Sequence, residues 1–409
     1  MKAVLIRFVR GLGVTLLFLI VALCVAITVV PPFLDRIYYE GAPSSHYDGE
    51  RFFNPDGEDT LRPPTGGSRG NFIIRYLTGS DGRPKWPDTV AVNQGYPPAE
   101  VTPCPMTKPR VAENWKRCVD KVDPGQMFAT WIGHATVLVQ ANGLNILTDP
   151  IYGETAGPFG IGPRRVTAPG IAFDDLPKID VVLVSHNHYD HMDINTLKRL
   201  WDRDKPLIVT SLGNDTLLKG AGITAVARDW GEWVPVKPGV NVTVTRNHHW
   251  GSRWGVDRNR ALWSSFVVTL PGGNVMFSGD TGFGNGQWPV EAAEYGPIRL
   301  ALIPIGAFRF VPGQMGTGTH IGPIDAAEVF VRSRARTAIG IHWGTFRLSY
   351  EAYQTPPKLL DAVMKCRGLS GFGAVTIGKP VEIAPYAPPP PGKPLNPKCI
   401  DTPAVRALK

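Results

Sequence analysis

The chain has 409 residues, 43% of them hydrophobic and 19% charged, so it can bury a large core, and disorder of the whole chain is excluded. Its 45 glycines and 39 prolines favour many turns and short strands over long helices. The formal net charge is +8, which is consistent with a soluble domain that has a few basic loops, or with a surface attracted to anionic lipid. We expect no nucleic-acid partner.

The first predicted element is an uncharged apolar run, Gly11 to Val30, which is long enough to cross a bilayer as a helix. The basic residues that precede it are Lys2, Arg7 and Arg10. They predict that the N-terminal end stays in the cytoplasm and that the rest of the chain lies on the outer face, which in a bacterium is the periplasm. We therefore predict that residues 1–32 form a signal anchor, a transmembrane helix that crosses the bacterial inner membrane once.

Two other fates of this apolar run are open. A cleaved signal peptide is one, although the run exceeds the usual apolar core of about 7–15 residues and no clear A-x-A site follows it. Processing as a lipoprotein at Cys24 is the other, and it is disfavoured because the large Leu23 precedes the cysteine. The uncleaved anchor is the preferred interpretation.

Residues 33–125 are rich in Pro, Gly, Asp and Arg and hold few periodic apolar stretches. We expect them to form an irregular arm packed on the main domain. The one clear packing element in this arm is Asn71 to Leu77.

Four cysteines lie outside the apolar run, at Cys104, Cys118, Cys366 and Cys399. An even number in an oxidising compartment suggests two disulfides, most simply Cys104–Cys118 and Cys366–Cys399, although three pairings can be drawn. Four free thiols are expected instead if the protein is cytosolic. No pair has the C-x-x-C spacing, so we expect no cysteine metal site.

From Met127 the sequence changes to apolar strands bounded by turns. The predicted strands cover residues 127–140, 144–148, 179–185, 266–270, 275–278, 300–305 and 337–341. The dipeptides at 142–143 (Asn-Gly) and 272–273 (Gly-Gly) predict hairpin turns. The strand at 179–185 is apolar almost throughout, which indicates a strand covered on both faces.

Helices are predicted between some of these strands. One begins at Asp193, a good N-cap, and another covers about 325–334. The side chains expected to face inward are Leu197, Leu200 and Trp201 in the first helix, and Ala326, Val329 and Phe330 in the second. Strands mixed with helices indicate an α/β or α+β sandwich, which we place at residues 126–384, followed by an extended proline-rich tail at 385–409.

The run from Ser185 to His191 (SHNHYDH) carries the chemistry. His186 and His188 are two residues apart, so in extended backbone they project from the same side and can hold one cation. Asp190 and His191 follow where the chain must turn, and are aimed at a neighbouring point that suits a second ion. Imidazole and carboxylate ligands with a position open to water are typical of catalytic zinc, whereas a polar loop with chance histidines is the alternative.

A site for two ions needs further ligands from other strand ends. Asp280 follows a predicted strand beside a glycine, and its carboxylate can bridge two ions. His342 has the same position after another strand, and Asn247-His248-His249-Trp250 offers two more candidates. Each alone is more often structural, but together with the first motif they predict a two-metal site.

This pattern resembles the metallo-β-lactamase superfamily and, more closely, the family of N-acylphosphatidylethanolamine-hydrolysing phospholipase D and its bacterial relatives. The resemblance runs from about residue 71 to about 346. The stretches that carry it are 131–136 (WIGHAT), 147–150 (LTDP), 185–193 (SHNHYDHMD), 249–250 (HW), 262–266 (LWSSF), 279–282 (GDTG), 303–307 (IPIGA) and 341–346 (IHWGTF).

The resemblance implies a four-layer αββα sandwich with two Zn²⁺ ions at one edge of the sheets. One ion is expected on His186, His188 and His249, and the other on Asp190, His191 and His342, with Asp280 bridging them. His249 is preferred to His248 because the histidine of the family directly precedes a tryptophan. His134 and Asp149 resemble residues that orient such ligands, with buried polar residues as the alternative.

The same resemblance implies hydrolysis of N-acylphosphatidylethanolamine to an N-acylethanolamine and phosphatidic acid, by a hydroxide that two zinc ions make available at neutral pH. Asp190, Asp280 and His320 are expected to act in catalysis. His320 matches a family histidine near the scissile phosphate, and a loop histidine without a role is the alternative. The partners implied are the phospholipid and the bilayer, and the family suggests a homodimer.

Two features depart from the family: the N-terminal anchor and the glycine-rich loop at 312–319. The rival functions are another hydrolase on the same fold, acting on a lactone, a β-lactam or a nucleic-acid phosphodiester, and a non-catalytic envelope protein that binds zinc. Five tryptophans also gather between 230 and 263, where they line an acyl groove, touch the membrane interface or pack in the core.

Overall fold

The fold is built on two seven-stranded mixed sheets that pack face to face. The computed structural model describes residues 2–57, 82–92, 125–309, 318–389 and 392–408. The predicted packing element at 71–77 and the cysteines at 104 and 118 lie outside the described residues.

The first sheet has the strand order β14-β1-β2-β3-β4-β5-β6. Its strands are β1 (Met127–Gly133), β2 (Thr136–Ala141), β3 (Leu144–Thr148), β4 (Val181–Val184), β5 (Leu207–Ser211), β6 (Val226–Arg228) and β14 (Pro380–Glu382). Strands β3 to β6 run parallel to one another, so their carboxyl ends lie at one edge of the sheet. The Asn-Gly hairpin between β2 and β3 forms as predicted.

The second sheet has the order β13-β12-β11-β10-β9-β8-β7. Its strands are β7 (Trp233–Lys237), β8 (Val240–Thr245), β9 (Ser265–Thr269), β10 (Asn274–Phe277), β11 (Ile298–Pro304), β12 (Thr337–Ile341) and β13 (Phe372–Gly373). The hairpin predicted at 272–273 joins β9 to β10. Strands β10 to β12 are parallel, so their carboxyl ends also lie at one edge.

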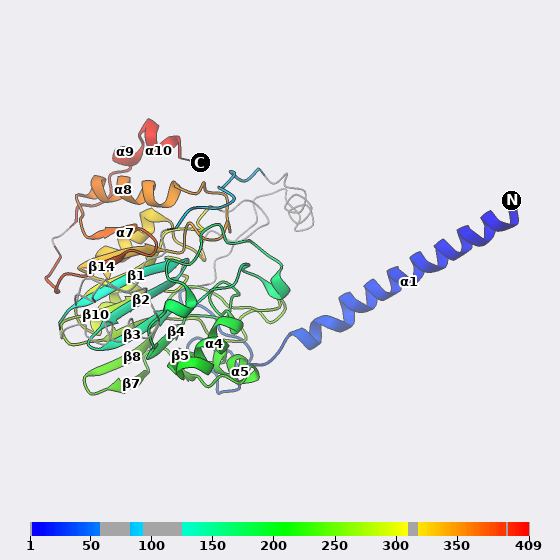
Figure 1. The fold of residues 1–409 in the computed structure, drawn as a ribbon, viewed down its shortest axis with the longest axis horizontal. Coiled ribbons are helices and arrows are strands. Elements are labelled where there is room, and N and C mark those ends of the chain that lie inside the picture. The colour runs from blue at the N-terminus through cyan, green and yellow to red at the C-terminus, as the bar shows by residue number, and fades with distance from the viewer. Residues whose placement is uncertain (1, 58–81, 93–124, 310–317, 390–391, 409) are drawn as a thin grey trace, which may run out of the picture.

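Helices cover the outer face of each sheet, which gives four layers (Figure 1). The helices are α4 (Ile194–Asp204) and α5 (Asn214–Gly220) on the first sheet, and α6 (Trp288–Glu294), α7 (Pro323–Arg332) and α8 (Thr355–Arg367) on the second. Asp193 caps α4 as predicted, because its side chain accepts from the backbone N–H groups of Asn195 and Thr196. The αββα sandwich inferred from the resemblance is thus confirmed.

The core lies in three layers of apolar side chains. Between the sheets, Val137 and Val139 of β2 belong to the same cluster as Val242 and Val244 of β8. Leu197 and Leu200 pack α4 on the first sheet, and Val329 and Phe330 pack α7 on the second. Burial of both faces explains why the strands are apolar without alternation.

One predicted element is wrong in a way that concerns the site. The strand expected over 127–140 is two antiparallel strands, β1 and β2, which turn at His134 and Ala135. His134 has a φ of 52°, in the left-handed region, and no glycine or proline within the turn residues signals the reversal. The turn brings His134 to the site edge instead of leaving it inside a strand.

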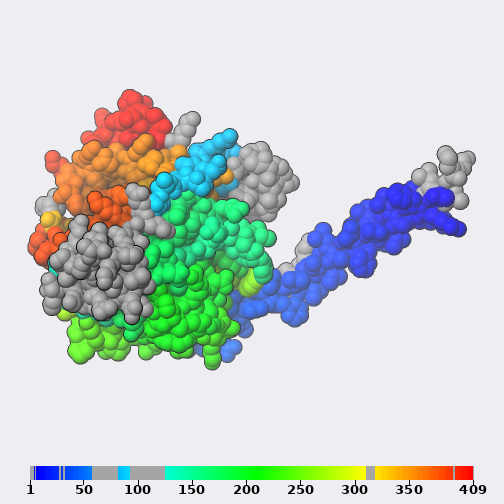
Figure 2. All heavy atoms as spheres, in the orientation of Figure 1, coloured from blue at the N-terminus to red at the C-terminus, as the bar shows by residue number. Residues whose placement is uncertain are grey.

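Helix α1 (Lys2–Leu34) extends from the rest of the protein as an exposed rod (Figures 1 and 2). Its stretch Ile6–Ala26 is long and apolar enough to cross a membrane, and a signal sequence meets the same criteria. The described parts of the arm pack on the sandwich: Tyr47 and Phe52 join Leu262 and Trp263 in one apolar cluster.

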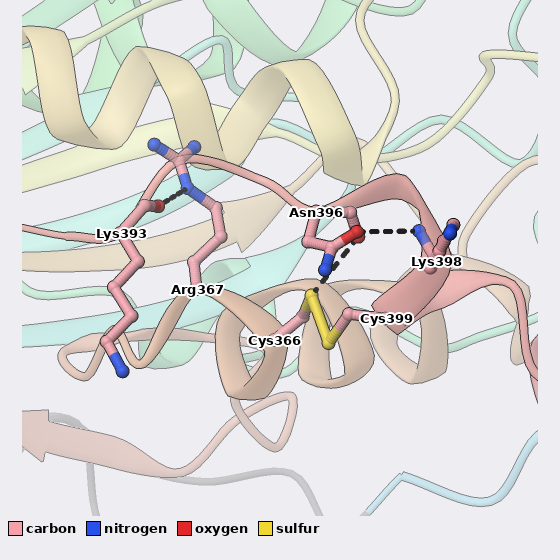
Figure 3. The surroundings of a disulfide bond; sticks show 6 residues. All are labelled: Cys366, Arg367, Lys393, Asn396, Lys398 and Cys399. Carbon is pink, nitrogen blue, oxygen red and sulfur yellow. Dashed lines mark hydrogen bonds between the residues drawn. A yellow bond between two sulfur atoms is a disulfide. The ribbon is translucent and has the colours of Figure 1, made fainter.

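The C-terminal tail is fastened to α8 by the predicted disulfide between Cys366 and Cys399 (Figure 3). Beside it, Arg367 Nε donates to the carbonyl of Lys393 at 3.1 Å. The tail also differs from the extended form predicted, since it contains two one-turn helices, α9 (Pro397–Ile400) and α10 (Pro403–Arg406). Asn396 caps α9 through its side chain, which a proline-rich composition does not reveal.

Candidate metal centre

The site residues follow the ends of strands from both sheets. The histidine motif follows β4, Asp280 follows β10 and His342 follows β12, while His249 lies four residues after β8. Because the sheets pack face to face with these ends at one edge, side chains far apart in sequence converge there. The seven predicted ligands lie close together in the structure, as two neighbouring groups of side chains with Asp280 beside them.

The first group contains three imidazoles. His186 Nε2 lies 2.8 Å from His188 Nδ1, which is 3.4 Å from His249 Nε2. The other ring nitrogen of His249 donates to the carbonyl of Thr319 at 2.8 Å, so Nε2 carries the lone pair. His186 Nδ1 lies 2.9 Å from the Ser185 hydroxyl, which leaves its Nε2 facing the group as well. Three ring nitrogens, His186 Nε2, His188 Nδ1 and His249 Nε2, therefore lie together at one place.

The second group contains one carboxylate and two imidazoles. Asp190 Oδ2 lies 3.5 Å from His191 Nε2 and 3.5 Å from His342 Nε2. Asp280 lies beside both groups: its Oδ2 is 3.1 Å from His191 Nε2, its Oδ1 is 3.1 Å from His342 Nε2, and a carboxylate oxygen lies within 4.8 Å of a ring nitrogen of His249. The choice between His248 and His249 is also resolved by position, because His248 Nδ1 points away to Asp56 Oδ1 at 3.0 Å.

The histidines of the centre fall into two sets that differ in the direction of their pKa shifts. Burial lowers the pKa of His186 and His249 well below the usual value and that of His188 to about 3, so their imidazoles are neutral. Burial also opposes the charge on His191 and His342, but the carboxylates of Asp280 and Asp190 outweigh it. These carboxylates raise the pKa of His191 well above its usual value and that of His342 to about 9.

The carboxylates of Asp190 and Asp280 are ionised because they lie beside these imidazoles. Burial raises the pKa of Asp190 and Asp280, but the neighbouring imidazoles, above all His191, lower it well below the usual carboxyl range. Negative charge is therefore concentrated between the two groups of nitrogens. A divalent cation is attracted to such a place, and it would replace the protons on His191 and His342.

The residues present fit a metal. Among the residues that the structure describes, several buried atoms of the centre lie in ion pairs but form no hydrogen bond of regular geometry: His191 Nε2, His342 Nε2 and Asp280 Oδ1. Buried polar atoms are rarely left so, because each costs about 1–3 kcal/mol. Neutral imidazole and carboxylate are the ligands that catalytic zinc takes, so a cation of this kind would satisfy these atoms.

Asp149 and His134 lie behind the proposed ligands. Asp149 Oδ2 accepts from His191 Nδ1 at 2.6 Å and from the Ser185 hydroxyl at 2.5 Å. This bond fixes the ring of His191 with Nε2 toward the centre. His134 Nε2 lies 3.0 Å from Asp190 Oδ2, and its ring is 4.1 Å from that of His342.

His320 joins the centre from the segment that precedes α7. Its ring lies 5.2 Å from that of His249 and 5.5 Å from that of His342, so it faces both groups. Its Nδ1 is 3.8 Å from Asp280 Oδ2. Burial lowers the pKa of His320 to about 4. Most of the glycine-rich loop before it, at 310–317, lies outside the described residues.

The segment that follows α1 contributes contacts that sequence reasoning missed. Asn54 Nδ2 donates to the carbonyl of His249 at 2.9 Å. Asp56 lies against His248 and also accepts from the backbone N–H of Asn285 at 2.9 Å. Both residues lie in a proline-rich arm almost two hundred positions before the histidines, and no local pattern relates the two segments.

Arg253 is a second missed residue. Its Nη1 donates to the carbonyls of Asn187 at 3.2 Å and Met192 at 2.8 Å, and its guanidinium lies 3.7 Å from the ring centre of Tyr189. It therefore holds the turn that carries His186 to His191. A single arginine in a loop gives no signal of this role in sequence.

Comparisons with known proteins agree with this geometry. The model of the beta-lactamase superfamily domain matches residues 144–343. An N-acyl-phosphatidylethanolamine-hydrolyzing phospholipase D of Caenorhabditis elegans is 37% identical over 252 residues, which span 58% of this chain and 70% of that protein. A mitochondrial protein of the same name from Saccharomyces cerevisiae is 32% identical over 248 residues, 59% of this chain and 53% of that protein.

Among solved structures, an isothiocyanate hydrolase from Delia radicum gut bacteria aligns with a TM-score of 0.51 and 18% identity, over 64% of this chain and all of that chain. At this identity the likeness concerns the fold alone. The residue range that the family model matches contains the histidine motif, His249, Asp280, His320 and His342. The proposed metal centre therefore lies within the matched domain.

Proposed function

Because this chain belongs to the metallo-β-lactamase superfamily, as a metal-dependent hydrolase related to the N-acyl-phosphatidylethanolamine-hydrolysing phospholipases D, we propose that it is a zinc-dependent phosphodiesterase of the phospholipase D type. The proposed reaction cleaves N-acylphosphatidylethanolamine to an N-acylethanolamine and phosphatidic acid. The observation that carries the proposal is the convergence of two groups of ligand atoms on the Asp280 carboxylate.

The proposed ligands form two sets that share one member. We assign His186, His188 and His249 to the first and Asp190, His191 and His342 to the second. Asp280 is assigned to both, because it lies near His249 as well as near His191 and His342. When bound, two zinc ions supply hydroxide at neutral pH and neutralise charge on the phosphoryl oxygens. The chain itself supplies the negative charge that holds them and the hydrogen bonds that fix the ligand rings.

The remaining chemistry falls to residues that face the reacting atoms. Asp190 is ionised and held by His134, so it can orient a water by accepting a hydrogen bond from it. His320 is neutral near pH 7 because its pKa is lowered to about 4, and a neutral imidazole can donate a hydrogen bond to the phosphoryl oxygen or to the departing alkoxide. No nucleophilic serine or cysteine is required.

The proposed location is the outer face of the bacterial inner membrane. Helix α1 serves as a single-pass anchor that keeps the site beside a lipid substrate. The disulfide between Cys366 and Cys399 supports an oxidising compartment such as the periplasm. Both features are consistent with a phospholipid substrate.

Product analysis with the purified full-length protein tests the proposal. We expect phosphatidic acid and an N-acylethanolamine from N-acylphosphatidylethanolamine in mixed micelles, and turnover of bis(p-nitrophenyl) phosphate in solution. Both activities should disappear with a chelator and return with added zinc. Turnover of a lactone with neither phosphodiester cleaved would reject phosphodiester hydrolysis while leaving a metal-dependent hydrolase in place.

A further inference from the structure

A narrow loop at 157–162 exposes two large apolar side chains. Among the described residues outside α1, Phe159 at 85% and Ile161 at 73% are the most exposed large hydrophobic side chains. Exposing these two apolar side chains to water is unfavourable, and it is relieved when a partner surface covers them. The loop lies between β3 and β4, and β4 leads into the histidine motif.

The loop has a fixed shape that holds these side chains outward. A Cβ on Gly157 would lie 1.9 Å from the carbonyl oxygen of Ile161, and one on Gly162, where φ is 142°, would lie 2.8 Å from that of Ala156. The neck is closed by the Ala156 N–H, which donates to the Pro163 carbonyl at 3.0 Å. Phe159 itself has a φ of 54°, a left-handed conformation that is unfavourable for a large side chain.

The end of α1 is bound to the loop that carries Arg253. Asp35, the first residue after the helix, forms two hydrogen bonds of 2.8 Å with Arg260, and the Tyr38 hydroxyl donates to Asp257 at 2.8 Å. Asp257 in turn accepts from the backbone N–H of Trp254 at 2.8 Å. No free linker therefore separates the helix from this part of the domain.

The exposed loop belongs to the same region. The ring of Trp254 lies 6.1 Å from that of Phe159, so the 250–260 loop contacts the 157–162 loop. Together with the root of α1, by which we mean residues 35–38, the two loops form a continuous surface. Ile37, at 57% exposure, adds to its apolar part, and the exposed cations Arg164 and Arg258 lie in the same segments. Basic side chains beside apolar ones suit a layer of anionic headgroups.

The length of α1 places this surface near the bilayer. The apolar run of the sequence ends at Val30 and the helix ends at Leu34, so only four residues, about 6 Å of helix, separate the run from its end. This is about the depth of one headgroup layer. The bound root then places the loops around it at the membrane surface.

We propose that Phe159, Ile161 and Trp254 form a rim that inserts into the lipid headgroup region beside the root of α1. Arg253, next to Trp254, holds the turn that carries His186 to His191, so the rim is joined to that turn through adjacent residues. The inference goes beyond the anchor to a second contact, and it rests on the proposed membrane location but not on the identity of the bond cleaved.

Photolabelling from within the bilayer tests the rim. The full-length protein is reconstituted in vesicles of phosphatidylcholine and phosphatidylglycerol that contain a phosphatidylcholine with a diazirine in its acyl chain. After illumination, mass spectrometry maps the adducts. We expect adducts in peptides containing Phe159 and Trp254 as well as α1; adducts confined to α1 would overturn the proposal.

A matched surface residue controls for unspecific labelling. Trp233 is also exposed, at 56%, and it lies on β7, outside the 157–162 and 250–260 loops. We expect no adducts there, and equal labelling of Trp233 and the rim would also overturn the proposal.

A double variant, Phe159→Ser with Ile161→Ser, tests whether the 157–162 loop contributes to membrane contact. It should reduce adducts at Trp254 by about tenfold, because two inserted side chains are lost, whereas Trp233→Ser should leave them unchanged. Unchanged labelling of Trp254 in the double variant would contradict a role for the loop. If adducts map to the rim but N-acylphosphatidylethanolamine is not cleaved, the proposed function fails and the rim stands.

Discussion

At the scale of single residues, Asp280 has the position on which the proposed centre depends. Its two carboxylate oxygens each lie 3.1 Å from a different imidazole, His191 and His342. We expect Asp280→Asn to lower metal content and phosphodiester turnover by at least about a hundredfold, because an amide keeps the shape but loses the charge. Asp202→Asn, the same change on the exposed face of α4, should have no effect, and retained metal and turnover in Asp280→Asn would exclude the centre.

His320 should behave differently from the proposed ligands. Because its ring faces both groups and we assign it to the leaving oxygen, His320→Gln should reduce turnover by about 10²–10⁴-fold while the bound metal remains. Metal analysis together with kinetics on bis(p-nitrophenyl) phosphate separates these effects. His46→Gln, a buried histidine against Trp230, serves as control. Loss of metal from His320→Gln would make His320 a ligand instead.

The metal-free protein should be most stable near pH 6.5. His191 and His342 have raised pKa values, about 9 for His342, so their contribution is complete below about pH 6.5 and is lost as pH rises through the folded values. Five histidines have lowered pKa values through burial, so the unfolded chain takes up more protons below about pH 6.5 and stability falls there. They are His134, His186, His188, His249 and His320.

Urea unfolding in the presence of a chelator, followed by tryptophan fluorescence of the full-length protein in detergent micelles, measures this profile. A midpoint that falls on both sides of about pH 6.5 agrees with the charges described. A midpoint that rises steadily from pH 6.5 to 9 would contradict the raised pKa of His342.

At the scale of elements, the segment after α1 acts as a strap that holds the site. Asn54 bonds the backbone of His249 and Asp56 bonds His248, so this strap supports the turn that carries a proposed ligand. Asn54→Ala should lower metal affinity by about tenfold and unfolding free energy by about 1 kcal/mol. Asn241→Ala, on β8, is the matched control.

The strap also predicts where truncation is tolerated. Removal of residues 2–34 should leave turnover of a soluble phosphodiester intact, since α1 itself contacts no part of the centre. Removal of residues 2–57 should abolish it, because the bonds from Asn54 and Asp56 are then missing. Equal activity of the two truncated proteins would show that the strap does not support the site.

At the scale of the whole molecule, the disulfide joins the C-terminal tail to the outer helix layer. It closes a loop with a sequence separation of 33 between Cys366 and Cys399. Cys399→Ser should lower the free energy of unfolding by about 2–4 kcal/mol, because the unfolded chain is no longer constrained. Chemical denaturation before and after reduction checks this value, and reduction should leave the Cys399→Ser protein unaffected in this respect.

Much of the fold could be predicted because its signals are local. The apolar strands, the two hairpins and the Asp193 cap each depend on a few neighbouring residues, and the structure confirms them. The turn at His134 could not be predicted, because its left-handed residue is stabilised by distant partners such as the Thr345 hydroxyl, which accepts from the His134 N–H at 2.7 Å. Strands β5 to β8, β13 and β14 and helices α5, α6 and α8 were not predicted for want of an equally clear pattern.

The sequence by itself predicted the ligand set that we propose, since a two-residue spacing at a strand end places His186 and His188 on one side, and strand-end positions mark Asp280 and His342. It determined neither the strap nor the role of Arg253. Only the tertiary structure decided these, because they depend on contacts between segments far apart in the chain, such as Asn54 with His249. Packing of whole sheets and loops fixes such contacts, and no local pattern encodes them.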